Sequence, residues 1–126
     1  MPQERENLPR LRREFYQGLV AVHWTFCLEN RARGWLSEAF AARFREVIVH
    51  AGVRHGCVCP AYCLMPDHLH VLLLGLGASS DLFLAARFLR THLGSGLIPS
   101  RFQKQGYDHV LREERMMAAN PVLQAA

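Results

Sequence analysis

The chain has 126 residues and a formal net charge of +4; half of its residues are hydrophobic and 21% are charged. One domain typically needs about 100–150 residues to bury a core, so this length favours a single domain with one functional site. No stretch approaches the roughly 20 apolar residues of a membrane span. The first residues, MPQERENLPRLRREF, lack the apolar core of a secretion signal, which predicts a soluble, cytoplasmic protein with no membrane partner.

Positive charge in this chain is carried almost entirely by arginine, which supplies all but one of its 15 basic residues. The planar guanidinium group matches pairs of phosphate oxygens. Nucleic acid is therefore a candidate partner. The alternative is that this modest positive charge only keeps the protein soluble.

The first half of the chain predicts an arm, a strand and a helix. A charged arm covers residues 1–17, and residues 18–126 are expected to form one domain. The segment 18–30, GLVAVHWTFCLEN, is rich in β-branched and aromatic residues and predicts a strand. Ser37 is placed to cap a helix with apolar residues at helical spacing, and Gly52 is placed to end it in a left-handed conformation.

Two apolar runs then predict an antiparallel hairpin. Residues 56–65 and 68–74 flank a very short turn, Pro66–Asp67. Proline and aspartate at such a turn are typical of a hairpin between two strands. Because both runs are strongly apolar, we expect the hairpin at the centre of the sheet.

The remaining segments predict a second helix, a fourth strand and a short final helix. Asp81 is placed to cap a helix that ends before Gly94, with Arg87 and Arg90 on its outward face. Residues 106–112 alternate as a strand does, and 113–120 favour a helix that stops before proline. The order β-α-β-β-α-β predicts an α+β fold of the ferredoxin-like type, a four-stranded antiparallel sheet with two helices on one face.

Four cysteines lie in apolar, strand-like segments: Cys27, Cys57, Cys59 and Cys63. We expect them to be reduced core residues, since nothing marks the chain for export. A rival interpretation joins the last three with His68 and His70 in a zinc site. The spacing C-x-C-x3-C lacks the C-x2-C knuckles of common structural zinc sites, which disfavours it.

The pair His68 and His70 opens a strongly apolar strand. Side chains two residues apart in a strand point to the same face, so both imidazoles project together while Leu69 points the opposite way. Two imidazoles side by side are a ready bidentate metal site. The alternative is a hydrogen-bonded pair of histidines at the mouth of the core.

The surroundings of these histidines resemble a known signature. The segment 62–74, YCLMPDHLHVLLL, with its M-P-[DN]-H-[apolar]-H core, resembles the HUH motif of single-tyrosine transposases, the family that includes REP-associated tyrosine transposases. VHWTFCLENR, the arginine-bearing second helix, FQKQGYDHVLR and NPV stand in the family's usual order. The resemblance covers residues 19–122, nearly the whole chain.

The resemblance implies an enzyme that nicks and rejoins single-stranded or hairpin DNA. It implies that His68 and His70 hold a divalent cation, magnesium or manganese, that polarises a scissile phosphate. A tyrosine on the C-terminal helix would attack that phosphate, leaving a 5′-phosphotyrosine link and a free 3′-OH without any nucleotide cofactor. The implied third metal ligand is Asn120. The family contains dimers and monomers, which leaves a homodimer open.

The C-terminal part departs from the family's pattern. Members commonly read Y-I-x-x-N-P-V, and residues 120–122 match its end, but Met116 stands where the nucleophilic tyrosine is expected. A thioether cannot attack phosphorus in this chemistry. The segment after Arg112 is also shorter than in relatives, so we expect a truncated C-terminal part. Tyr107 is the fallback nucleophile, although its context equally suits a strand residue at the sheet edge.

Five basic residues are candidates for a track of DNA-phosphate contacts beside the histidines: Arg87, Arg90, Arg101, Lys104 and Arg112. A plain solvated face would explain Arg87 and Arg90 as well. Three further histidines lack spacing support and are interpreted as core or surface residues: His23, His92 and His109.

Two classes of function therefore stay open. One is the DNA-nicking enzyme; the other is a non-catalytic module, remnant or domesticated, that binds hairpin or single-stranded DNA without cutting it, which the missing tyrosine favours. A phosphoesterase with paired H-x-[ST] motifs is disfavoured because HLH lacks the hydroxyl and no matched second motif is present.

Overall fold

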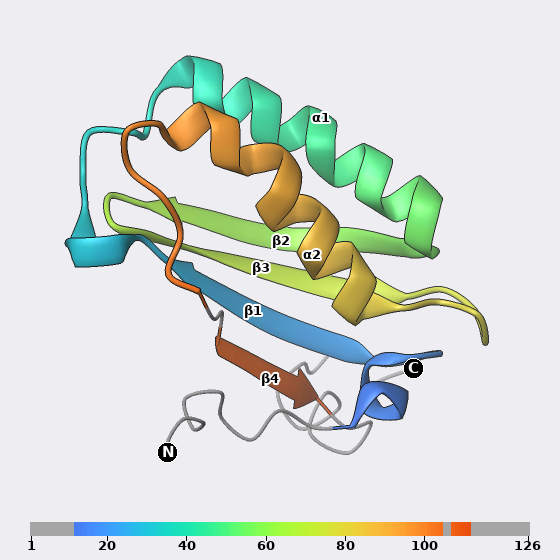
Figure 1. Ribbon diagram of the computed structural model, residues 1–126. Helices are drawn as coiled ribbons and strands as arrows, with labels where there is room; N and C mark the ends of the chain where they lie inside the picture. The colour runs from blue at the N-terminus through green and yellow to red at the C-terminus, as the bar shows by residue number, and fades with distance from the viewer. Residues whose placement is uncertain (1–11, 105–106, 112–126) are drawn as a thin grey trace, which may run out of the picture.

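The computed structural model describes residues 12–104 in full and residues 107–111 as backbone. Its four strands are β1 (Ala21–Cys27), β2 (Cys57–Met65), β3 (His68–Gly75) and β4 (Tyr107–Leu111). They form one sheet in the order β2-β3-β1-β4, and every neighbouring pair is antiparallel. The helices α1 (Glu38–His55) and α2 (Leu82–Leu93) both lie over the same face of this sheet (Figure 1). The α+β class, with two helices on an antiparallel sheet, is confirmed.

Strands β1 and β3 alternate between two environments. Their buried residues include Val22, Trp24, Phe26, Leu69, Val71 and Leu73. The residues between them are only partly buried. This period of two is what a sheet with one covered face requires, so the helix side forms the core, and the opposite face carries His23, Thr25, His68 and His70 together with Leu72 and Leu74.

Helix α1 begins where the sequence predicts but ends one turn later. The Ser37 hydroxyl accepts a hydrogen bond from the Phe40 N–H at 3.1 Å, which caps the first turn. The predicted end at Gly52 is wrong: the helix continues to His55, and Gly56 ends it with a φ of 71°. A side chain at Gly52 would meet the Cys57 carbonyl, so this glycine serves a close approach between α1 and β2.

The predicted hairpin is present, with the turn Pro66–Asp67 between β2 and β3. Its predicted central position is right for β3 but wrong for β2, which is an edge strand because β1 pairs with the other side of β3. Proline removes a backbone donor and is tolerated in a sheet mainly at edges and bulges. Pro60 lies in β2 where the register shifts between Val58 and Ala61.

The packed structure starts earlier than the predicted domain boundary at residue 18. Residues Arg13–Tyr16 form the 3-10 helix η1, and Tyr16 is fully buried with its ring stacked on Trp24 at 5.6 Å. The end of the expected charged arm therefore belongs to the core, while residues 1–11 lie outside the described part. The strand predicted over residues 18–30 is shorter, β1, and the 3-10 helix η2 (Glu29–Arg31) follows it.

The later elements agree with the sequence as far as they are described. Helix α2 begins at the Asp81 cap, and the 3-10 helix η3 (Gly94–Leu97) follows it. The predicted strand near residues 106–112 is β4, whereas the predicted helix over 113–120 lies outside the described residues. Within the described residues no helix has the length and apolar character needed to cross a membrane.

Two glycines in and just after β3 give a matched test of packing. A Cβ at Gly75 would meet the Gly18 carbonyl oxygen, whereas a Cβ at Gly77 would meet nothing within 4 Å. We expect Gly75→Ala to lower the free energy of unfolding by about 1–3 kcal/mol, because the backbone of Gly18 must shift. Gly77→Ala should be neutral or stabilising by a few tenths of a kcal/mol. Urea denaturation of both variants checks this, and equal effects would contradict the close approach.

Asp81 links the N-terminal segment to α2 and generates a pH-dependent prediction. Its carboxylate accepts hydrogen bonds from the backbone of Phe83 and Leu84 and from Gln17, and it pairs with Arg13 at 3.3 Å. Burial alone would raise the pKa of Asp81, but these partners outweigh it and lower the pKa below the ordinary value of 3.8. The ionised carboxylate therefore stabilises the fold above that value, and the gain is lost as pH falls through the lowered pKa.

We expect Asp81→Ala to lower the free energy of unfolding by about 1–2 kcal/mol at neutral pH, because the helix loses its cap. The deficit should shrink in strongly acidic buffer, where the wild-type carboxyl is protonated. Chemical denaturation at both pH values measures it. Asp81→Asn is the control, since its amide oxygen still caps; a deficit independent of pH would contradict the ionic contribution.

Candidate functional site

Three imidazoles meet on the sheet face opposite the helices. His68 and His70 come from β3, with ring centroids 4.8 Å apart, and His23 from β1 lies 5.0 Å from His70. The register of β1 with β3 sets Thr25 opposite His70 and Cys27 opposite His68. The predicted juxtaposition of the H-x-H pair is therefore present, and the sheet adds His23, which the sequence analysis interpreted as a lone histidine.

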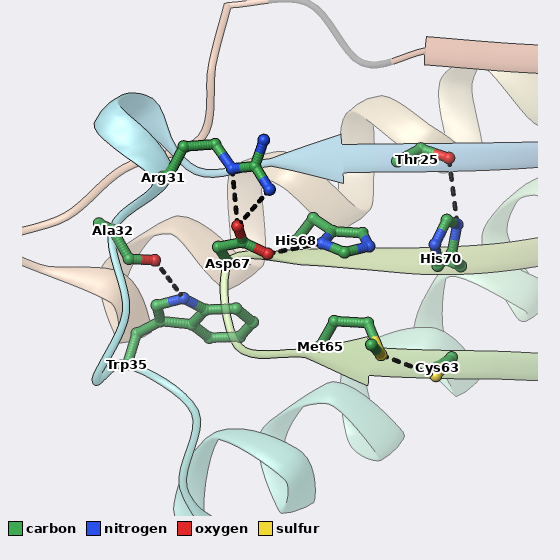
Figure 2. A network of polar contacts seen from close by, with 9 residues as sticks. All are labelled: Thr25, Arg31, Ala32, Trp35, Cys63, Met65, Asp67, His68 and His70. Atoms are coloured by element: carbon green, nitrogen blue, oxygen red, sulfur yellow. Dashed lines mark hydrogen bonds and ion pairs between the residues drawn. The ribbon is translucent and has the colours of Figure 1, made fainter.

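His70 is held through its Nδ1 atom. The Nε2 atom of His23 lies 3.0 Å from it and the hydroxyl of Thr25 lies 3.2 Å from it (Figure 2 shows the Thr25 contact). Burial lowers the pKa of His70, and the neighbouring imidazoles of His23 and His68 lower it further. His70 is therefore neutral at physiological pH and keeps a nitrogen lone pair.

His68 is also held through Nδ1, but by an anion. The Oδ1 atom of Asp67 lies 2.7 Å from it, and the other carboxylate oxygen is bound by Arg31 (Figure 2). The hydrogen bonds from His68 and then from Arg31 lower the pKa of Asp67, so the carboxylate stays ionised. A carboxylate can only accept, so Nδ1 of His68 is the donor in this hydrogen bond, and Nε2 is the nitrogen left to ligate.

The Nε2 atoms of both histidines are available to a ligand. Neither has a hydrogen-bond partner within the described part of the chain. In metal sites the ligating imidazole commonly donates its other N–H to a neighbour, as His68 does here. The donor set thus fits a divalent cation held by two nitrogens. No group of three His, Cys, Asp or Glu side chains among the described residues forms a complete site, so further ligands must come from elsewhere.

A pocket beside His70 gives a ligand room to approach. It has a volume of about 350 Å³. Its walls are His23, Ala61, Tyr62, Cys63, His70 and Leu72. The cluster of imidazoles therefore borders a cavity rather than a flat sheet surface.

Comparison with solved structures identifies the fold that carries this site. A REP-associated tyrosine transposase solved with a REP hairpin superimposes with a TM-score of 0.68 and 19% identity, over 89% of this chain and 67% of that one. A candidate transposase of Deinococcus radiodurans R1 gives a TM-score of 0.59 and 13% identity, over 85% of this chain and 90% of that one. The chain has a tyrosine transposase fold. At such identities the likeness concerns the fold alone. No protein-family model and no curated protein sequence matches the chain.

In this transposase fold, the predicted nucleophile and third ligand are described only in part. Tyr107 lies opposite Thr25 in the register of β4 with β1, and Thr25 lies opposite His70 in the next pair, so these positions share one row across three strands. His109 lies opposite His23 in the same way. Met116 and Asn120 lie outside the described residues, as does Arg112.

Of the four predicted DNA-contact residues whose side chains the structure describes, three lie away from the histidines. Arg87, Arg90 and Lys104 line a pocket of about 180 Å³ together with Trp24 and Phe26, whose side chains face the helices. These three cations therefore lie on the other side of the sheet from the imidazoles, because α2 and the loop after it cover that side.

Arg90 is not a simple outward residue of α2. Its guanidinium donates to the carbonyls of Gln103 and Lys104 and lies over the rings of Phe26 and Phe102. The expectation that it faces outward is corrected, since helix α2 turns this position toward the loop. Arg101 is exposed and pairs with Glu29 at 3.1 Å, close to the turn that holds Asp67. His92 is exposed on α2, in line with a surface role.

All four cysteines are free thiols, as predicted, but only Cys57 is a fully buried core residue. Cys63 is exposed because its register opposite His70 puts it on the face away from the helices. Its thiol contacts the Met65 sulfur at 3.4 Å (Figure 2). The rival zinc site gains no support, since these thiols and the histidines form no three-ligand cluster among the described residues.

Thiol reactivity tests this arrangement. Burial raises the pKa of Cys57 to about 11, whereas Cys63 is open to solvent. We expect a disulfide reagent at mildly alkaline pH to label Cys63 rapidly and Cys57 only after unfolding, because the thiolate is the reactive form. Mass spectrometry of digested, labelled protein identifies the sites, with Cys63→Ser as control. Rapid native labelling of Cys57 would contradict the packing of β2 against α1.

Proposed function

We propose that this chain is a soluble, cytoplasmic, metal-dependent protein that nicks and rejoins single-stranded or hairpin DNA. One observation carries the proposal: two neighbouring imidazoles on one rigid strand have both Nδ1 atoms engaged and both Nε2 atoms without a partner in the described structure. The tyrosine transposase fold supports it, as does the strand order β2-β3-β1-β4, which we assign to the ferredoxin-like type.

His68 and His70 would hold the cation, magnesium or manganese, and Asn120 remains the proposed third ligand. When bound, such an ion withdraws charge from a phosphate oxygen of the DNA. Neutral His70 and ionised Asp67 suit this role, since imidazoles must be unprotonated to ligate. The pocket beside His70 leaves space for the sugar-phosphate chain next to the ion.

Strand cleavage needs a hydroxyl nucleophile, and we propose Tyr107. Its position shares a row with Thr25 and His70, about 10 Å from His70 at a strand spacing of about 4.8 Å. The phenol oxygen would bond to phosphorus while the bond from phosphorus to the 3′ oxygen breaks. The phenol proton passes to solvent, and the leaving oxygen takes a proton to become a 3′-OH. The 5′ phosphate stays on the tyrosine until another 3′-OH reverses the reaction.

Contacts to DNA phosphates are assigned to exposed cations at two places. Arg101 lies near the turn that holds Asp67, at the His68 end of the site. Arg87 and Lys104 lie on the helix side of the sheet, with Arg90 lining the same pocket. Arg112 is assigned with them from the sequence. Such contacts would make DNA binding weaken steeply with added salt.

A second candidate function is DNA binding without cleavage. Met116 favours it, because this residue stands where the pattern Y-I-x-x-N-P-V of the resembling family has its tyrosine. The same metal site and cations would then retain a hairpin while strand scission is absent. This candidate and the nicking enzyme differ in one outcome, the covalent adduct between protein and DNA.

The test is a cleavage and binding assay on labelled single-stranded hairpin DNA with Mn²⁺, run on denaturing protein gels. We expect the wild-type chain to form a covalent adduct, and Tyr107→Phe and His68→Ala to lose it. His50→Ala, an exposed histidine on α1, is the matched control and should retain the adduct. Hairpin binding without an adduct would support the second function, and absence of both Mn²⁺ and DNA binding would refute both.

A further inference from the structure

The residue before the H-x-H pair, Asp67, makes a direct polar contact with His68. Asp67 Oδ1 lies 2.7 Å from His68 Nδ1, and the Asp67 side chain is only 14% exposed. Asp67 belongs to the two-residue turn between β2 and β3, and its carbonyl accepts a hydrogen bond from the Leu28 N–H at 3.1 Å. The backbone of Asp67 is therefore held by the turn and by this hydrogen bond, and its carboxylate starts from a defined position beside His68.

Arg31 occupies the other carboxylate oxygen. Its Nε and Nη2 atoms both lie 2.6 Å from Asp67 Oδ2 (Figure 2). Both donors contact Oδ2, so Oδ1 remains the carboxylate oxygen that faces His68. Because the guanidinium is always charged, it also keeps Asp67 ionised.

The loop that delivers Arg31 is strained. Asn30 and Arg31 have φ values of 58° and 52°, in the left-handed region that side chains other than glycine rarely adopt. Residues in this region persist when their surroundings hold them in place. Here the Arg31 N–H donates to the Leu28 carbonyl at 3.1 Å, and the Arg31 guanidinium binds the turn.

We propose that Arg31 and Asp67 form a positioning pair that fixes the tautomer and the lone-pair direction of His68. Asp67 accepts a hydrogen bond from the Nδ1–H of His68, which leaves the lone pair on Nε2 facing away from the turn. Arg31 holds the carboxylate in that orientation. The expected change in metal affinity rests on the function proposed above. The expected tautomer of His68 does not depend on that function.

The Nδ1 atoms of the two histidines have different partners, so the inference applies to His68 and not to His70. His68 is supported by an anion, whereas the Nδ1 atom of His70 faces the neutral hydroxyl of Thr25 and the imidazole of His23. A carboxylate partner raises the basicity of an imidazole ligand, and loss of such a partner typically costs about 10–100-fold in metal affinity. Removing Asp67 should therefore weaken metal binding more than removing the Thr25 hydroxyl.

The experiment uses the full chain with Asp67→Asn, Asp67→Ala, Arg31→Ala and Thr25→Val. Glu29→Gln is the matched control, because it removes a neighbouring ion pair, that with Arg101, without touching His68. Three quantities are measured: the His68 tautomer by nitrogen-15 NMR without metal, the Kd for Mn²⁺ by calorimetry, and the melting temperature. A merely structural role for the pair would change the melting temperature alone.

We expect wild-type His68 to be a single Nδ1–H tautomer. Asp67→Ala should give a mixture of tautomers and raise the Kd for Mn²⁺ by about 10–100-fold. Asp67→Asn keeps an acceptor oxygen, so it should keep the tautomer while raising the Kd by about tenfold. Arg31→Ala should fall between these variants, Thr25→Val should raise the Kd less than Asp67→Ala, and Glu29→Gln should match wild type.

The outcomes separate this inference from the proposed function. If Asp67→Ala leaves the His68 tautomer unchanged, the positioning pair is refuted, whatever the metal does. If the tautomer shifts as expected but wild-type protein binds no Mn²⁺, the positioning stands and the metal-dependent function fails. A Kd that is the same in Asp67→Ala and wild type would refute the link between the pair and the ion.

Discussion

The antiparallel pairing of β1 with β3 is the constraint from which the site follows. It sets Thr25 opposite His70 and Cys27 opposite His68, and it brings His23 next to the pair. A slip of one residue would turn every side chain of a strand to the other face and drive the imidazoles into the helices. Burying a large apolar side chain contributes about 1.5–3 kcal/mol, so the aromatic and aliphatic residues beneath the helices resist such a slip. The packing of apolar side chains under the helices thus keeps the imidazoles in place on the opposite face of the sheet.

Local patterns in the sequence predicted much of this framework. The hairpin turn, the caps at Ser37 and Asp81 and the shared face of His68 and His70 each depend on residues a few positions apart, and the structure has them. The end of α1 was predicted wrongly at Gly52, because glycine marks a close approach as readily as a helix end. The apolar run Val71–Leu74 does not alternate in the sequence, so it could not show which of these side chains the helices cover; the structure shows that Val71 and Leu73 are buried.

The supporting residues of the site could not be found in this way. His23 and Thr25 reach His70 only through the β1–β3 register, which joins positions far apart in the chain. Arg31 reaches Asp67 through two left-handed residues, a backbone path that no propensity favours for arginine. The Asn30-Arg31 pair gave one usable signal, since asparagine tolerates a positive φ better than most residues. Contacts between residues on different strands can be identified only once the pairing of the strands is known.

The interruption of β2 limits how copies of this chain can meet. A regular edge strand offers a row of free N–H and C=O groups to which another chain can add as a further strand. In β2 that row is broken, because Pro60 has no N–H and the bulge between Val58 and Ala61 puts the remaining groups out of step. The sheet is therefore protected from growing outward past the middle of this edge. Addition of a second chain along the whole length of β2 is therefore disfavoured, because Pro60 and the bulge interrupt its free edge.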